Sequence, residues 1–151
     1  MKVLIVKTSS LGGIVHALPA VTEASHFLPS IQFDWLVEEA VCSIPSLHPS
    51  INNIIPVSLR EWRRNISKAA IEIPAFVKKL RSIDYDLIID SQGLLKSGVL
   101  TGISRGKSVG FDIKSSREKA ASFFYTSSYR VAKTDHAILR QKSLFAQSLG
   151  Y

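Results

Sequence analysis

The sequence predicts an α/β fold: a Rossmann-like, doubly wound sheet of mainly parallel strands with helices on both faces. One observation is that short apolar segments alternate with helical patterns along the whole chain. Another is that residues 3–6 (VLIV) are apolar without a break, which is typical of a parallel strand buried on both faces. A polar turn with two glycines, residues 8–13, then leads into a helical pattern. Ligands of such sheets bind outside the carboxyl ends of the strands, so this turn is a candidate binding loop.

The strands and the first helix follow from the apolar pattern. Apolar residues recur at helical spacing from Ile14 to Phe27, and Pro29 closes this helix. Pro56 places one predicted strand at or near the sheet edge, because proline cannot donate to a central ladder. Strands are predicted at residues 31–37, 51–57, 85–90 and 108–113, and residues 130–132 are a further candidate.

Helices are predicted between these strands and at the end of the chain. In the helix outlined by residues 71–80, Pro74 either kinks the helix or marks its first turn. The last helix has Thr134 as its expected N-cap and Gly150 as the residue after its end. Helices are predicted near residues 40–47, over 71–80 and 94–100, and over about 134–149.

Length and composition bound the class of protein. A chain of 151 residues with 46% hydrophobic content is expected to form one domain, residues 1–151, that needs no disulfide or metal. The single cysteine, Cys42, is interpreted as a small buried hydrophobic residue and leaves no cysteine-based metal site. The apolar run after Lys2 is too short for a signal peptide, and no run is long enough to span a bilayer, so we expect a cytoplasmic protein.

The charge favours anionic partners without choosing among them. The formal net charge is +7 and the pI is about 9.7. Such a chain is attracted to nucleic acid, to an anionic membrane surface and to a phosphorylated glycolipid alike.

The binding loop lacks the familiar cofactor signatures. The segment TSSLGG contains neither GxGxxG nor the phosphate-binding GxxxxGK[ST] pattern, so no cofactor is predicted. Two interpretations of Gly12 and Gly13 remain open. They let the backbone turn sharply into the helix, or they free backbone N–H groups that bind an anion together with Ser9 and Ser10.

Two further clusters follow predicted strands. Arg60, Arg63 and Arg64 form a basic loop in solvent or a site that captures carboxylate or phosphate groups bidentately. Asp90 either ends a buried strand and caps the next helix or faces the ligand with Gln92 and Lys96, where it is also a candidate base. His16 is interpreted as packed or capping, and the patch of residues 123–125 (FFY) as core.

Six segments in order resemble lipopolysaccharide heptosyltransferase I, in glycosyltransferase family 9. They are KTSSLGGIVHALPAV, FDWLVEE, REWRR, DLIIDSQGLLKS, SSREKAASFFY and LFAQSLGY. The resemblance covers all 151 residues but only the N-terminal half of such an enzyme. It implies the acceptor-binding half of a two-domain GT-B fold, without the C-terminal nucleotide-sugar domain.

The resemblance implies an inverting transfer of heptose from ADP-heptose to Kdo2-lipid A, in inner-core lipopolysaccharide synthesis. The expected place is the cytoplasmic face of the inner membrane, with peripheral attachment and no nucleic acid partner. The family has its proposed catalytic base, an aspartate, where this chain has Gly13, so the chain alone is expected to be inactive. The residues expected to bind the acceptor are Ser9, Ser10, Arg60, Arg63, Arg64, Asp90, Gln92, Lys96, Arg117 and Arg140.

A different interpretation is a non-catalytic remnant or a basic anion-binding module. Nucleic acid binding by such a module would fall steeply with salt and would be indifferent to the sugar. Acceptor binding would instead require Kdo.

Overall fold

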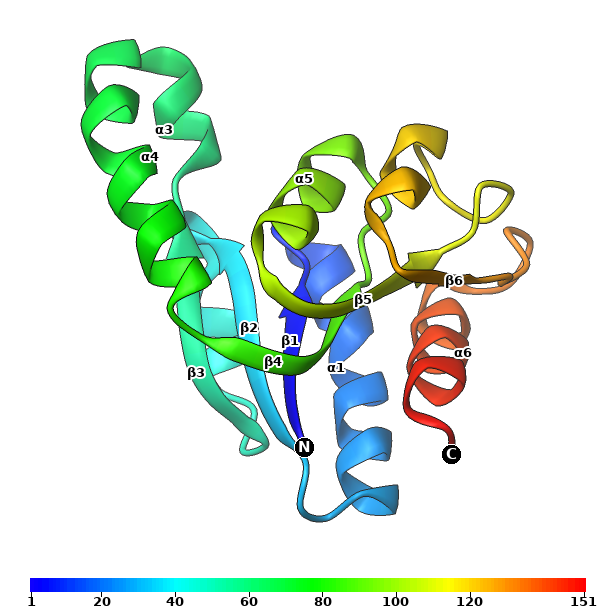
Figure 1. Ribbon diagram of the computed structural model, residues 1–151. Coiled ribbons are helices and arrows are strands. Elements are labelled where there is room, and N and C mark those ends of the chain that lie inside the picture. Colours follow the sequence, from blue (N-terminus) through cyan, green and yellow to red (C-terminus); the bar gives the residue numbers. More distant parts are fainter.

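A computed structural model describes residues 1–151 and contains one parallel sheet of six strands (Figure 1). The strand order is β3-β2-β1-β4-β5-β6, and every neighbouring pair is parallel. This is the order of a Rossmann sheet, so the predicted fold class is confirmed. The strands are β1 (Lys2–Val6), β2 (Gln32–Glu38), β3 (Ile51–Val57), β4 (Asp84–Asp90), β5 (Arg105–Phe111) and β6 (Ser127–Tyr129).

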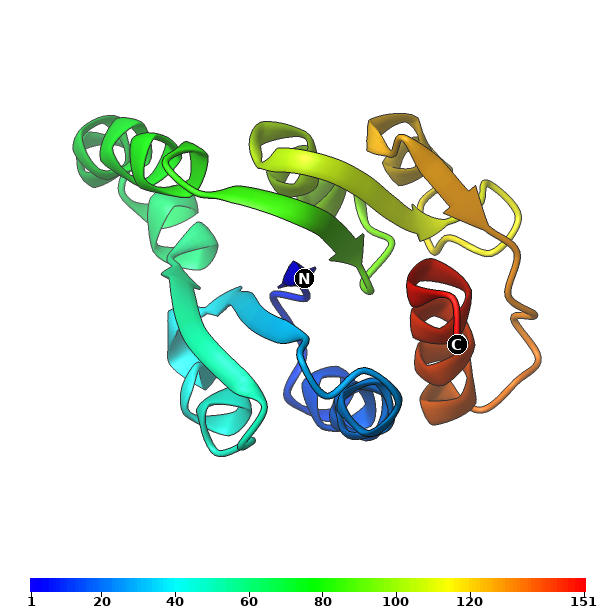
Figure 2. The ribbon, with the colours of Figure 1, turned by 60° about the horizontal axis from the view of Figure 1, so that its bottom comes forward.

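Helices cover both faces of the sheet (Figures 1 and 2). Val3 and Ile5 of β1 belong to the core under α1 and α6, whereas Leu4 and Val6 belong to the core under α4 and α5. This double burial explains the unbroken apolar run of β1. The helices are α1 (Leu11–Phe27), α2 (Ser43–Ser46), α3 (Leu59–Arg64), α4 (Ile66–Arg81), α5 (Leu95–Ile103) and α6 (Ala137–Leu149), with 3-10 turns η1 (Glu39–Val41) and η2 (Lys119–Phe124).

None of these helices has the length and apolar character needed to cross a bilayer.

The first helix begins earlier than the apolar spacing predicts. It starts at Leu11 rather than Ile14, so Gly12 and Gly13 lie in its first turn. Neither glycine has a positive φ angle. The interpretation that they make a sharp backbone turn is therefore wrong, and the chain has already turned in the residues before them.

The basic segment after β3 is helical rather than a loop. It forms α3 and the first turn of α4, which begins at Ile66 and contains Pro74 in its interior. The side chain of Asn65 caps α4 by accepting a hydrogen bond from Lys68 N (3.0 Å). The carboxylate of Glu38, at the end of β2, accepts from the backbone N–H groups of Leu59 (3.3 Å) and Arg60 (3.0 Å) at the start of α3. Pro56 lies in β3, which is an edge strand as predicted.

The C-terminal third shows three corrections. The last strand is β6, at residues 127–129 rather than 130–132. The last helix has His136 as its N-cap instead of Thr134, because the His136 ring accepts from Ile138 N (3.2 Å), while Gly150 ends the helix with φ 78° as predicted. Phe123 is 79% exposed and Phe124 is 38% exposed, so the core interpretation fails for both. Cys42 is only half-buried but does pack against the core.

Candidate ligand site at the carboxyl edge of the sheet

The loops after β1 and β4 are joined by hydrogen bonds. Thr8 donates from its backbone N and its hydroxyl to the side-chain oxygen of Gln92 (2.7 and 2.9 Å). The ammonium of Lys7 donates to the carbonyl of Ser91 (2.9 Å). β1 and β4 are neighbours whose following helices, α1 and α5, lie on opposite faces of the sheet. These loops therefore form the topological switch point, where open α/β sheets bind ligands.

The N-terminus of α1 opens at this point. Its first backbone N–H groups have no acceptor within the helix, and the side chain of the N-cap residue Ser10 makes no capping hydrogen bond. A Cβ atom placed on Gly13 would lie 3.3 Å from Cε and 3.7 Å from Nζ of Lys7. The positive end of the helix dipole and a lysine ammonium are thus close together, which favours an anion.

A hollow of about 380 Å³ lies between α1, the two loops and α6. We call it the polar hollow. Cationic side chains line it and acidic side chains do not. Two buried oxygens in its wall, Ser91 Oγ and Gln141 Oε1, have no hydrogen-bond partner in the protein. The lining residues are Lys7, Ser9, Ser10, Gly12, Gly13, His16, Ser91, Gln92, Phe111, Arg117, Ala137, Arg140 and Gln141.

Burial and mutual repulsion disfavour the charged forms of these cations. Burial, together with the charges of Arg117 and Arg140 and against the opposing charge of Asp90, lowers the pKa of Lys7 to about 8. Burial, and then Arg117, also lower the pKa of Arg140. The Arg140 guanidinium donates to Ser115 O (2.7 Å) and lies 4.9 Å from the centre of the Phe111 ring. A bound anion would relieve this repulsion.

Asp90 lies beneath the polar hollow and is not part of its lining. Its carboxylate accepts from Gln92 N (2.9 Å), Gly93 N (3.1 Å) and the hydroxyls of Ser97 (2.8 Å) and Tyr125 (2.6 Å). Burial raises the pKa of Asp90, and these hydrogen bonds oppose that rise. Asp90 thus holds the loop that carries Gln92 and, through Ser97, the start of α5. A buried group with four donors is poorly placed to act as a base.

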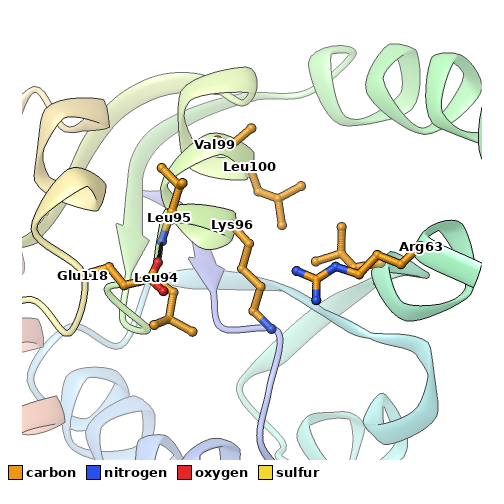
Figure 3. A pocket seen from close by; sticks show the side chains of 8 residues that line it. Arg63, Leu94, Leu95, Lys96, Val99, Leu100 and Glu118 are labelled. Carbon is orange, nitrogen blue, oxygen red and sulfur yellow. Dashed lines mark hydrogen bonds between the residues drawn. The ribbon is translucent and has the colours of Figure 1, made fainter.

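A second hollow of about 600 Å³ lies between α3 and α5 (Figure 3). We call it the α3–α5 groove. In Figure 3, Arg63 reaches from α3 and Lys96 from α5 into the same space. The Lys96 ammonium donates to Ser9 Oγ (3.1 Å), which also accepts from Gln92 Nε2 (3.3 Å). Ser9 thereby connects the groove with the polar hollow. The groove is lined by Leu59, Arg63, Leu94, Leu95, Lys96, Val99, Leu100 and Glu118.

The structure separates the arginines that are adjacent in sequence. Arg63 lines the α3–α5 groove, whereas Arg60 and Arg64 line a separate depression beside Glu38 and Glu39. Arg60 and Arg64 lie four residues apart and therefore share a side of α3. Of the other predicted residues, Lys96 lines the groove, and the polar hollow is lined by Ser9, Ser10, Gly13, Gln92, Arg117 and Arg140.

Sequence reasoning missed Lys7, Ser91 and Gln141 as site residues. A signal for Lys7 was present: it is a cation directly after a fully apolar strand, at the end where these sheets bind ligands. No local pattern marks Gln141, which α6 brings to the site from 50 residues beyond Ser91 and whose amide donates to the Ser91 carbonyl (3.0 Å).

Fold and geometry together define a Rossmann-like α/β protein with a hollow lined by cationic side chains at its topological switch point. Residues 73–151 match the model of glycosyltransferase family 9 (heptosyltransferase), and the chain belongs to this family.

Related proteins match the chain over its full length. It is 48% identical to lipopolysaccharide heptosyltransferase 1 of Pseudomonas aeruginosa, covering 100% of this chain and 43% of the relative. The corresponding Escherichia coli K12 enzyme is 47% identical, with 100% and 48% covered. The chain thus spans about half the length of these relatives.

Solved structures agree with the fold. The E. coli heptosyltransferase WaaC with ADP-2-deoxy-2-fluoro heptose superposes with a TM-score of 0.95 at 46% identity, covering 100% of this chain and 49% of that one. The E. coli ADP-heptose lps heptosyltransferase II superposes with a TM-score of 0.73 at 17% identity, over 96% of this chain and 40% of that one, and shows the shared fold alone.

Proposed function

We propose that residues 1–151 are the acceptor-binding half of a lipopolysaccharide heptosyltransferase 1, which transfers heptose from ADP-heptose to Kdo2-lipid A. The observation that carries this proposal is the polar hollow, which has cationic walls and no acidic side chain. It lies at the switch point of a chain 47–48% identical to heptosyltransferase 1 proteins. A second half, of the kind present in the longer relatives, would supply the site for the nucleotide sugar.

The chemistry of the acceptor suits the hollow. Kdo is an acidic sugar, and its carboxylate would be attracted by Lys7, Arg117 and Arg140 and by the N-terminus of α1. The unpartnered oxygens of Ser91 and Gln141 would accept hydrogen bonds from sugar hydroxyls. The acceptor is a lipid, so we also propose peripheral association with the cytoplasmic face of the inner membrane, supported by the net charge of +7.

We further propose that this chain lacks the base for the transfer. An acceptor hydroxyl would attack the anomeric carbon of ADP-heptose, the bond to the diphosphate oxygen would break, and a base would take the hydroxyl proton. Gly13 is where the family's aspartate is expected, and glycine has no group that can accept a proton. Losing a positioned base costs roughly 10² to 10⁴ in rate.

The acceptor proposal is tested by measuring binding of Kdo2-lipid A to this chain, with the same lipid lacking Kdo as the control, over a range of salt concentrations. We expect Kdo-dependent binding that weakens in Arg117→Gln and Arg140→Gln. Lys107→Gln should leave it unchanged, because this exposed lysine of β5 loses the same charge outside the hollow.

Equal binding of the two lipids would contradict the acceptor proposal. With a steep loss at high salt, it would instead favour a basic anion-binding module. The net charge of +7 makes that the second candidate.

The base proposal is tested separately, in a protein where this chain is joined to the C-terminal half of the E. coli relative. Gly13→Asp should raise turnover by roughly 10² or more. Gly12→Asp should not, because its side chain would extend into open space beside the same helix end. Equal turnover in the Gly13→Asp variant and its parent would refute the proposal.

A further inference from the structure

The α3–α5 groove differs in chemistry from the polar hollow beside it. Five of its eight lining residues are hydrophobic. Leu100 forms a buried part of the wall, while Leu95 and Val99 on the same helix are 45% and 39% exposed. Leu59 of α3 lines the opposite wall. The aliphatic side chains of α5, with Leu59 across from them, leave apolar surface in water that a hydrocarbon chain would cover.

The cationic and the acidic side chains that line the groove point in different directions. In Figure 3 the Arg63 guanidinium points into the space between the helices, and the Lys96 side chain ends at the loop after β1, where its ammonium donates to Ser9 Oγ. The carboxylate of Glu118 is turned to the start of α5, where it accepts a hydrogen bond from Leu95 N. Burial lowers the pKa of Lys96, as do the nearby charges of Arg63 and Arg60, against the opposing charges of Glu38 and Glu118. The space beside Lys96 is therefore one that an anionic group would stabilise.

We propose that the α3–α5 groove binds an acyl chain of the acceptor glycolipid, with Arg63 and Lys96 holding an anionic group of the same molecule at the mouth of the groove. That the occupant is the acceptor rests on the proposed function. Lys96 and the polar hollow share Ser9, so one molecule can place its acidic sugar in the hollow and its hydrocarbon chain in the groove.

The test uses alkyl phosphates, which contain a chain and an anion but no Kdo. Binding of decyl and octyl phosphate to this chain is measured by calorimetry below their micelle concentrations, with inorganic phosphate and decyl maltoside as single-feature controls. Two fewer methylenes should weaken binding roughly tenfold, because each buried methylene contributes about 0.8 kcal/mol. Inorganic phosphate and decyl maltoside should each bind more weakly than decyl phosphate.

Matched variants locate the site. Val99→Ser should weaken decyl phosphate binding roughly fivefold, whereas Val15→Ser, at a 46% exposed valine of α1, should not. Arg63→Gln and Lys96→Gln should remove the preference for decyl phosphate over decyl maltoside. Lys78→Gln, at an exposed lysine of α4 outside the groove, should keep it.

Three outcomes would overturn the proposal: equal affinity for octyl and decyl phosphate, equal effects of Val99→Ser and Val15→Ser, or an unchanged headgroup preference in both charge variants. Because the probes contain no Kdo, these outcomes leave Kdo-dependent acceptor binding untouched. Conversely, decyl phosphate could bind to the groove as proposed while lipid binding does not depend on Kdo. That result would refute the proposed function and would leave the groove as a binding site for amphiphiles.

Discussion

Replacing Gly13 with aspartate should change the ionisation of Lys7. The new Cβ would lie 3.3 Å from Cε and 3.7 Å from Nζ of Lys7, so the neighbouring flexible side chain has to move by only a few tenths of an ångström. The carboxylate would then lie beside a buried ammonium that has no carboxylate in its immediate contacts. It would also lie in the first turn of α1, where a negative charge is favourable.

The magnitude follows from the pKa of Lys7, which burial lowers from 10.5 to about 8. That difference corresponds to about 3 kcal/mol of unfavourable free energy for the charged lysine at neutral pH. An opposite charge within hydrogen-bonding reach shifts a pKa by roughly 1 to 3 pH units. We therefore expect Asp at position 13 to return the pKa of Lys7 most of the way to its ordinary value.

The lowered pKa of Lys7 makes the stability of the folded chain depend on pH. Between about pH 8 and 10 the unfolded parent chain keeps the Lys7 proton while the folded chain releases it. The free energy of unfolding of the parent should therefore rise with pH across this range, as the cost of the buried charge disappears. The Gly13→Asp variant should show a smaller rise, because its folded state keeps the proton to higher pH.

The assay is an NMR titration of the ε-carbon of Lys7, assigned by its loss in Lys7→Gln, together with urea unfolding at pH 7.5 and 9.5. Gly12→Asp is the matched control, since it adds the same charge one residue away with no atom within 4 Å of its Cβ. The reasoning is refuted if the Lys7 midpoint stays near 8 in Gly13→Asp or moves as far in Gly12→Asp.

Two further predictions concern side chains that hold the elements around the site in place, and both are checked by urea unfolding. Glu38→Gln should destabilise the chain by roughly 1–2 kcal/mol, because the charged acceptor at the start of α3 is lost. Glu39→Gln, at an exposed position, should cost much less, and equal losses would contradict the capping role. Tyr125→Phe should cost roughly 1–3 kcal/mol, because the buried Asp90 loses a 2.6 Å donor. Tyr129→Phe is its control, and a neutral Tyr125→Phe would show that Asp90 does not need this donor.

The site could be predicted from the sequence only in part. The sequence predicts that the loops after β1 and β4 lie at the ligand site, because the carboxyl ends of neighbouring parallel strands meet at one edge of the sheet. The sequence does not predict that α3 is a helix, because two interactions that stabilise it involve residues outside it. Glu38 of β2 accepts hydrogen bonds from its first N–H groups, and Trp62 donates to Glu72 of α4 (2.8 Å). A local pattern contains neither partner.

The roles of Asp90 and Phe123 were likewise decided by tertiary contacts. The local sequence around a carboxylate at the end of a strand is the same whether its side chain faces a ligand or is buried under the loop. The four donors around Asp90, together with its burial, show that it lies under the loop and holds it in place. Phe123 and Phe124 are adjacent apolar residues, yet Phe124 packs against Gly98 and Gly102 of α5 while Phe123 is 79% exposed.

The sequence by itself determined the α/β class, the parallel sheet, the family resemblance and the cationic character of the chain. These properties follow from the spacing of the apolar residues, the order of the motifs and the charge, all of which are contained in the sequence. The tertiary structure alone decided which cations share a site: it gathered Lys7, Arg117 and Arg140 in one hollow and turned Arg63 away from Arg60 and Arg64. The physical reason is that a ligand site is made by side chains distant in the sequence, whose directions are fixed by packing rather than by their own neighbours.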